Sequence, residues 1–186
     1  MTTAATLPAL LTYDEYRTLP DDGYRYELIE GELFVFATPS FEHQLASGEL
    51  FALFREAITL KGLGRVVTAP VEVKFRGENA VQPDLVVVLR DRYHLLAKTR
   101  IEGPPSLVLE ILSPSTRTYD LTTKAALYAK HGVPEYWIVN IETETITVHE
   151  LRDGRYVPLP DGPIAHSRIV PGLAIDVPAL FAAIRR

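Results

Sequence analysis

The chain has 186 residues, of which 47% are hydrophobic and 23% are charged, with a formal net charge of −5 and no cysteine. This size and apolar content predict a single domain, residues 1–186, with a substantial core. The lack of cysteine excludes disulfides, zinc ribbons and thiol nucleophiles. Because the net charge gives no overall attraction to nucleic acid, a DNA or RNA partner would need a local cluster of the 14 arginines and 5 lysines.

Two further features bear on location. The longest apolar runs, LVVVL and LVLEIL, are far shorter than the ~18 residues of a membrane span. The N-terminal MTTAATLPAL lacks the basic region and long apolar run of a signal peptide. We therefore expect a cytoplasmic protein that does not contact a membrane.

The N-terminal region predicts a short helix and then a hairpin. Thr12 and Glu15 have the spacing of a capping box, so a helix is expected to run from there to about Leu19. The segment YRYELIEGELFVF alternates in two halves around Glu30 and Gly31. Since glycine tolerates the positive φ of a tight turn, this pattern predicts two antiparallel strands.

A long helix is expected next, with Ser40 as its N-cap and Gly62 as its stop. Its apolar positions recur at helical spacing and are Ala46, Leu50, Leu53, Phe54 and Ala57. The following segment predicts three strands, at residues 65–68, 71–75 and 85–89, of which the last is apolar throughout. The segment SLVLEIL is a fourth strand, and it should also be buried on both faces.

The segment TYDLTTKAALYAKHG is helical in pattern, with Leu121, Ala125 and Tyr128 on one stripe and Gly132 as a left-handed C-terminal cap. The strand EYWIV follows it. A strand, a helix and a strand within about 35 residues form a βαβ unit, whose two strands should be parallel. The tail predicts a second hairpin at Asp153-Gly154 and a short helix near PALFAAIRR.

A carboxylate stands inside one of the two apolar strands. Burial of Glu110 costs several kcal/mol unless the group is paired, hydrogen-bonded, protonated or bound to a metal. Asp84 stands at the entrance of the other apolar strand, directly after Pro83. If the two strands are neighbours, the carboxylates converge, and a divalent cation with hard oxygen ligands stabilises such a pair. The sequence therefore predicts a Mg²⁺ or Mn²⁺ site.

At these residues the chain resembles a known family. PDLVVV, then LVLEILSPST, then DLTTKAALYAKHGVPEYWIV resemble the Uma-type family of predicted bacterial endonucleases, in the PD-(D/E)xK restriction-endonuclease-like superfamily. RYELIEGEL and ATPSFEHQ fit the same family, so that the resemblance covers nearly the whole chain. It implies an α/β fold with a central mixed sheet flanked by helices, here with β-hairpins near both ends, and a metal-dependent site for phosphodiester cleavage.

The chain departs from the superfamily pattern at one position. Where the pattern places lysine, two residues after the glutamate, this chain has Leu112. Lys124 is the candidate replacement, because it lies on the helix that follows the strand and its long side chain can reach back over the sheet. In the family's pattern a lysine recurs on that helix, so the resemblance supports a migrated catalytic lysine.

The expected mechanism uses these groups together. Asp84, Glu110 and the main-chain carbonyl of Ile111 would hold Mg²⁺ or Mn²⁺, which polarises the phosphate and lowers the pKa of bound water. Lys124 would orient that water or stabilise the developing negative charge.

Three further residues are assigned supporting roles. His43 and Gln44 lie in the first turn of the long helix, where they can contact phosphate or complete the metal shell. Glu27 can supply another carboxylate from the hairpin. Glu27 and His43 both match positions that recur in the family. Taken alone, His43 reads as a polar residue of the first helical turn and Glu27 as an exposed strand residue.

Three functions remain open on the sequence. One is a metal-dependent endonuclease acting on DNA through Asp84, Glu110 and Lys124. Another is a catalytically weak or inactive relative that serves as a binding or oligomerising module, which the acidic charge and the missing strand lysine favour. The third is a hydrolase of some other phosphate ester or small molecule. A homodimer is expected with the first function, since nucleases that cut both strands often pair two sites.

Overall fold

The computed structural model describes residues 10–114 and 116–185. Residues 1–9 of the N-terminal segment MTTAATLPAL, for which no signal peptide is expected, lie outside the described residues. None of the helices in the described part of the chain is long and apolar enough to cross a membrane.

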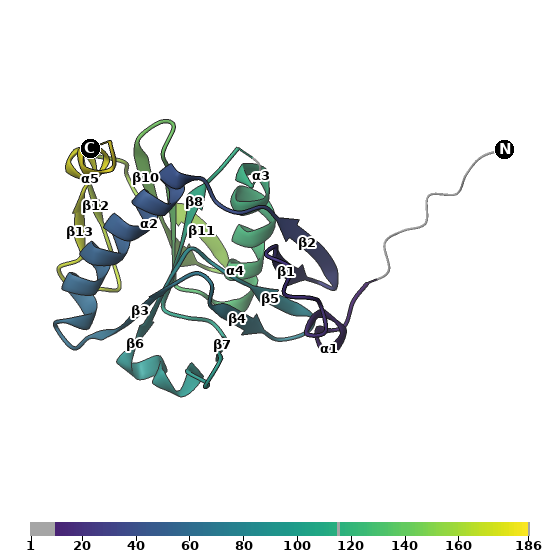
Figure 1. The fold of residues 1–186 in the computed structure, drawn as a ribbon. Coiled ribbons are helices and arrows are strands. Elements are labelled where there is room, and N and C mark those ends of the chain that lie inside the picture. The colour runs from purple at the N-terminus through teal and green to yellow at the C-terminus, as the bar shows by residue number, and fades with distance from the viewer. Residues whose placement is uncertain (1–9, 115, 186) are drawn as a thin grey trace.

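A six-stranded mixed sheet forms the centre of the fold (Figure 1). Its strands, in order across the sheet, are β11 (Arg155–Pro158), β10 (Thr145–Arg152), β9 (Glu135–Asn140), β8 (Leu107–Leu112), β6 (Leu85–Leu89) and β3 (Gly64–Thr68). Strands β8 and β9 are parallel, as predicted for the βαβ unit, and every other neighbouring pair is antiparallel.

A second, five-stranded sheet packs beside the first. Its strands, in order, are β2 (Glu32–Phe36), β1 (Arg25–Ile29), β5 (Asn79–Val81), β4 (Glu72–Phe75) and β7 (Arg100–Glu102). Strands β5 and β7 were not predicted, because three residues are too few to show an alternating pattern. A third, two-stranded sheet consists of β12 (Ile164–His166) and β13 (Ala174–Asp176).

The helical elements lie between and around the sheets. They are α1 (Tyr13–Tyr16), α2 (Phe41–Phe54), the π-helical η1 (Arg55–Thr59), the 3₁₀-helical η2 (Arg90–Leu95), α3 (Arg117–Tyr119), the π-helical η3 (Asp120–Lys124), α4 (Ala125–His131) and α5 (Val177–Ile184). The predicted capping box is present in α1, but this helix ends at Tyr16 rather than near Leu19. Ser40 caps α2 and Gly132 closes α4 in the left-handed conformation, both as predicted.

The two hairpins form at the predicted turns. Glu30 and Gly31 have φ values of 51° and 83°, and Asp153 and Gly154 have 49° and 77°. Positive φ at both central residues matches the right-handed twist of the flanking strands. The β1–β2 and β10–β11 pairs follow from these turns.

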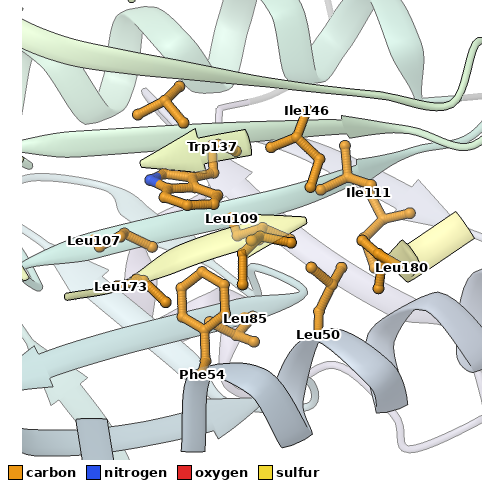
Figure 2. Packing of buried hydrophobic residues seen from close by; sticks show 14 of the residues in the cluster. Leu50, Phe54, Leu85, Leu107, Leu109, Ile111, Trp137, Ile146, Leu173 and Leu180 are labelled. Carbon is orange, nitrogen blue, oxygen red and sulfur yellow. The ribbon is translucent and has the colours of Figure 1, made fainter. Parts of the chain in front are cut away.

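The central sheet has an apolar core on each face. On one face α2, α5 and the β12–β13 sheet pack against alternate residues of β8, among them Leu107, Leu109 and Ile111 (Figure 2). On the other face α4 and the five-stranded sheet pack against Val108 and Leu112. Because Glu110 alternates with the first set, it points into the second core, where no bulk water can solvate its charge.

The buried face of η3 and α4 differs from the predicted apolar stripe. Tyr128 is buried, but Leu121 is 43% exposed. The buried stripe instead runs through Asp120, Lys124 and Tyr128 at four-residue spacing. Two charged residues therefore occupy positions that would normally be apolar, and they face Glu110.

Candidate active site

Asp84 and Glu110 meet through the pairing of two central strands. The antiparallel register of β6 and β8 pairs Leu85 with Leu109, so one further step places Asp84 opposite Glu110. Directly opposite residues project from the same face of a sheet. Asp84 is 4% exposed and Glu110 is 1% exposed. The two acids, distant in the sequence, therefore share one buried region, as expected.

Asp84 is held from three sides. Its Oδ2 accepts a hydrogen bond of 2.8 Å from the main-chain amide of Ile111 and lies 3.2 Å from Nε2 of His43. Its Oδ1 lies 3.3 Å from a guanidinium nitrogen of Arg25. Burial alone would raise the pKa of Asp84, but the His43 hydrogen bond and the nearby charges, including those of Lys124 and Arg25, hold it below its ordinary value. Asp84 is therefore an anion with a fixed orientation.

The main chain of Ile111 lies beyond the paired part of β6 and β8. The pairs end at Leu85 and Leu109, and Pro83 stands two residues before Leu85. Proline has no amide hydrogen, so it cannot donate the ladder bond to the Ile111 carbonyl. In an antiparallel ladder the N–H and C=O of one residue point to the same neighbouring strand. The Ile111 carbonyl therefore points to the side on which its amide binds Asp84.

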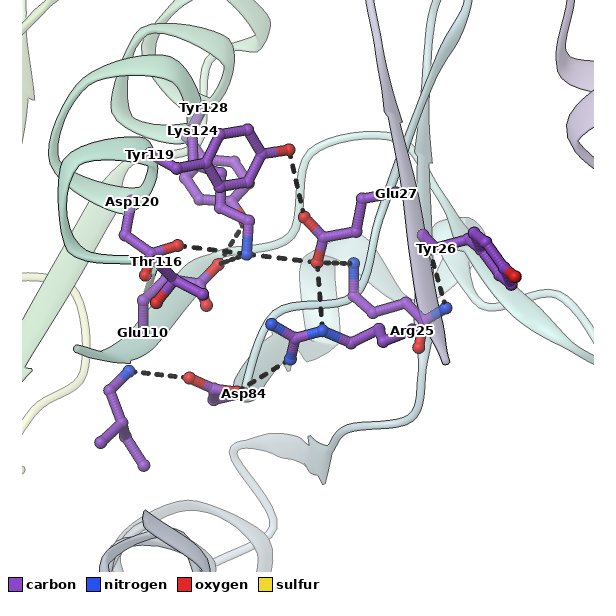
Figure 3. Close-up of polar contacts among 12 residues, drawn as sticks. Arg25, Tyr26, Glu27, Asp84, Glu110, Thr116, Tyr119, Asp120, Lys124 and Tyr128 are labelled. Atoms are coloured by element: carbon purple, nitrogen blue, oxygen red, sulfur yellow. Dashed lines mark hydrogen bonds and ion pairs between the residues drawn. The ribbon is translucent and has the colours of Figure 1, made fainter. Parts of the chain in front are cut away.

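Lys124 lies at the centre of three carboxylates (Figure 3). Its Nζ is 2.9 Å from Glu110, 3.2 Å from Glu27 and 3.4 Å from Asp120, and its side chain is fully buried. Burial alone would lower the pKa of Lys124, but the three anions raise it above its ordinary value, so the ammonium stays charged. The π-helical turn η3, a feature often found at functional sites, ends at this residue.

Glu110 is the carboxylate with the most strongly perturbed protonation. Burial raises its pKa to about 8, and the negative charges of Asp120, Asp84 and Glu27 add to this effect against the attraction of Lys124. The hydroxyl of Tyr128 donates a hydrogen bond of 2.6 Å to its Oε1. Burial is therefore the main reason that Glu110 is costly to ionise, and the neighbouring carboxylates add to this cost.

Glu27 is fully buried, in contrast to the exposed strand residue that its sequence position alone suggests. Its Oε1 accepts a hydrogen bond of 3.1 Å from the amide of Gln82, and its Oε2 lies 3.3 Å from the Tyr119 hydroxyl. Glu27 is buried because β1, in the five-stranded sheet, turns this face toward η3 and not toward solvent. Glu27 thus belongs to the cluster around Lys124.

The two candidate residues in the first turn of α2, His43 and Gln44, differ in their burial. His43 is 8% exposed and bonds Asp84, whereas Gln44 is exposed. Both line a pocket of about 310 Å³ that also exposes parts of Arg25 and Asp84. The structure therefore brings His43 into the site and leaves Gln44 exposed on the lining of this pocket.

Four residues of the cluster were missed from the sequence. They are Arg25, Tyr119, Asp120 and Tyr128. Spacing would have found three of them: Asp120 and Tyr128 stand four residues before and after Lys124, and Arg25 stands two before Glu27 on a strand. Leu112 occupies the position at which the superfamily pattern places lysine. It is buried in the second core, so an apolar side chain fills this position and no lysine side chain can enter it.

The fixed carboxylates already have partners. Among residues 10–114 and 116–185, no group of three or more histidine, aspartate or glutamate residues is arranged as a ready metal site. Lys124 instead stands between Glu27, Glu110 and Asp120.

Comparisons with known proteins bear on the family and the fold of the chain. The family Uma2, described as "Putative restriction endonuclease", matches residues 13–178. A crystal structure of a "putative nuclease belonging to DUF820" from Anabaena variabilis has a TM-score of 0.78 at 20% identity, covering 94% of this chain and 99% of that one. The type IIG restriction endonuclease BpuSI gives a TM-score of 0.42 at 16% identity, covering 81% of this chain and 17% of its own.

No curated protein matches the chain. The family match and the Anabaena variabilis structure confirm the predicted restriction-endonuclease-like α/β fold. The family match spans 166 residues, from Tyr13 to Pro178, and includes every residue placed in the site above. The chain therefore belongs to the Uma2 family of putative restriction endonucleases.

Proposed function

We propose that this chain is a Mg²⁺- or Mn²⁺-dependent endonuclease that hydrolyses DNA phosphodiester bonds. The observation that carries the proposal is the convergence of Asp84, Glu110 and Lys124 in one buried cluster, with the lysine supplied by the helix after β8. The family's description as restriction endonucleases supports DNA as the substrate.

The charges in the cluster fit a divalent cation. Four buried carboxylates, those of Glu27, Asp84, Glu110 and Asp120, face the permanent cations Lys124 and Arg25. When all four are ionised, two negative charges are left over. A divalent cation would neutralise these charges and favour ionised Glu110, whose pKa is raised first by burial and then by the neighbouring carboxylates. Asp84, Glu110 and the Ile111 carbonyl are hard oxygen donors of the kind that Mg²⁺ and Mn²⁺ prefer.

The roles of the residues follow from their surroundings. A bound ion would polarise the phosphate and lower the pKa of a water molecule. Asp84 is held rigid by His43 and Ile111, so it fixes the position of the ligands. Lys124 keeps its positive charge and can stabilise the negative charge that develops on the phosphate. Tyr128 orients the carboxylate of Glu110 through its hydroxyl.

The direct test is nicking of supercoiled plasmid DNA by the full chain with Mg²⁺ or Mn²⁺, compared with Glu110→Gln. We expect conversion to the nicked form by the wild type and loss of conversion by the variant. Equal activity in both proteins would remove this site from the proposal. If neither protein cuts any nucleic acid tested but both fold, the binding or oligomerising module is the better description.

We propose a homodimer together with this activity, because one site cuts one strand and two paired sites are needed to cut both. Sedimentation of the full chain measures this directly. A dimer is expected to give linear plasmid early in the reaction, whereas a monomer would give only nicked circles at that stage.

A further inference from the structure

Basic residues are concentrated at one end of the central sheet. Residues 60–65 and 90–98 contain five lysines and arginines and one aspartate, which gives these two segments a net charge of +4. Since the whole chain carries −5, the remaining residues carry −9. Such a local excess of one sign in a chain of the opposite sign indicates a surface for a charged partner. We call it the basic surface; it consists of Lys61, Arg65, Arg90, Arg92 and Lys98.

The fold brings the two segments together. The register of β3 and β6 pairs Gly64 with Leu89, and the amide of Arg90 donates a hydrogen bond of 3.1 Å to the carbonyl of Leu63. The guanidinium of Arg90 lies over Gly62, 3.1 Å from the point where a Cβ atom would stand. Lys61, Arg65 and Arg90 are therefore brought together at the end of the sheet, where a short helix follows β6 in Figure 1.

Four of the five side chains are available to a partner. Lys61, Arg65, Arg90 and Lys98 are exposed. Arg92 is instead partly buried and donates hydrogen bonds of 2.8 and 3.3 Å to the carbonyls of Pro104 and Pro105, which fixes η2 to the following loop. Residues 90–92 are thus held by hydrogen bonds to Leu63 at one end and to Pro104 and Pro105 at the other.

The basic surface and the candidate active site lie at opposite ends of strand β6. Asp84 directly precedes β6 and Arg90 directly follows it. At a rise of about 3.3 Å per residue, the six steps between them span roughly 20 Å. This corresponds to about six base pairs of a DNA duplex, which rises 3.4 Å per pair. A duplex that extends beyond the cleavage site is long enough to reach the basic surface.

We propose that the basic surface binds the phosphate backbone of duplex DNA outside the candidate active site. The choice of DNA as the polyanion rests on the proposed function, whereas the surface itself rests on charge and exposure. Arginine favours phosphate because its planar group donates two parallel hydrogen bonds. Such contacts position the protein on the duplex without reading its sequence.

The test measures affinity for a fluorescent DNA duplex of about 30 base pairs by anisotropy, in EDTA and at a series of salt concentrations. The test variant is Arg65→Gln with Arg90→Gln. The control is Arg155→Gln with Arg168→Gln, which removes the same charge from exposed positions elsewhere. A third variant, Arg65→Lys with Arg90→Lys, keeps the charge and shows that the surface tolerates substitution.

We expect the test variant to lose about tenfold in affinity near 0.1 M salt and to reduce the slope of log K against log salt by about 2. The control should stay close to the wild type, and the lysine variant should retain most of the binding. Equal losses in the test and control variants would show only the effect of net charge and would overturn the proposal. So would unchanged DNA affinity accompanied by lost binding to vesicles containing phosphatidylserine.

The outcome is independent of the cleavage test. If the wild type nicks plasmid but the test variant binds DNA as well as the wild type, only the basic surface is wrong. If the test variant loses DNA affinity but the wild type cuts nothing with Mg²⁺ or Mn²⁺, only the proposed cleavage is wrong.

Discussion

The ammonium of Lys124 lies 2.9 Å from Oε1 of Glu110, although the two residues are 14 positions apart and come from a helix and a strand. In the superfamily pattern that the sequence resembles, the corresponding lysine stands two residues after the glutamate on the same strand. Here Leu112 takes that place in the core, and the positive charge reaches the glutamate from the helix.

Removal of the Lys124 ammonium should lower stability strongly. Lys124→Met leaves Glu27, Glu110 and Asp120 without their shared cation, and loss of one partner from a buried ion pair costs about 3–5 kcal/mol. Urea unfolding measures the change. The matched control is Lys130→Met on the same helix, whose partner Glu30 is exposed and where about 1 kcal/mol or less is expected. Equal effects would mean that the buried cluster does not depend on its ammonium.

Mn²⁺ should stabilise the wild type and not a variant that lacks a metal ligand. A ligand at about 100 times its Kd adds about 2.7 kcal/mol to the free energy of unfolding. We therefore expect a rise in Tm on adding Mn²⁺, reversed by EDTA. In Asp84→Asn, which keeps the size of the side chain and can still accept from the Ile111 amide, the rise should disappear. The same rise in both proteins would place the ion elsewhere.

The Tyr128 hydroxyl should matter for activity beyond its effect on stability. Tyr128→Phe removes a hydrogen bond of 2.6 Å to Glu110, and Tyr156→Phe removes one of 2.9 Å to the carbonyl of Val133. Each should cost about 1–2 kcal/mol of stability, since one hydrogen bond is lost in both, buried at Tyr128 and partly buried at Tyr156. Plasmid nicking should fall in the first variant and be retained in the second. Comparable nicking by both would show that Tyr128 only supports the fold.

Stability should fall as the pH is lowered through the range in which buried histidines take up protons. His149 lies against Tyr136 and Tyr156, with ring centroids 6.1 and 6.3 Å away, and burial lowers its pKa from 6.5. The unfolded state therefore binds the proton first, so the stability that neutral His149 contributes is complete above about pH 6.5 and is lost as the pH falls through the lower, folded-state pKa.

His149→Phe should reduce the loss of stability between about pH 7.5 and pH 5.5, measured by urea unfolding at both values. His131, whose pKa is also lowered by burial, keeps part of the dependence in this variant. The control is His94→Gln at an exposed position. A pH dependence of the same size in His149→Phe as in the wild type would contradict the assignment.

The fold was largely predictable because local patterns and long-range packing agree in most of it. Turns such as Glu30-Gly31, the cap at Ser40 and the apolar strands β6 and β8 were visible as patterns of a few residues. Strands β5 and β7 were not, because they are short and are defined by pairing, that of β5 with β1 and β4 and that of β7 with β4. The meeting of Asp84 and Glu110 was predictable because an isolated charge in an apolar strand must have a partner.

The rest of the cluster was harder to predict, because it depends on how the two sheets pack. Glu27 occupies an ordinary alternating strand, and nothing in its neighbours indicates that its face is covered by η3. Likewise, the stripe assigned to Leu121 and Tyr128 assumed that apolar residues fill the buried face of the helix. Lys124 occupies it instead, because the anions opposite make a buried cation favourable there.

The helical residues that precede α4 determine on which side of the helix the Lys124 amine stands. Each residue of an α-helix turns the chain by about 100°, so one insertion or deletion within residues 117–124 would carry the amine to a different side of the helix. A lysine on the strand itself would be aimed by simple alternation, whatever the length of the loop beyond it. Because the Lys124 amine comes from the helix, the number of helical residues before it constrains the site as strongly as the type of residue at position 124.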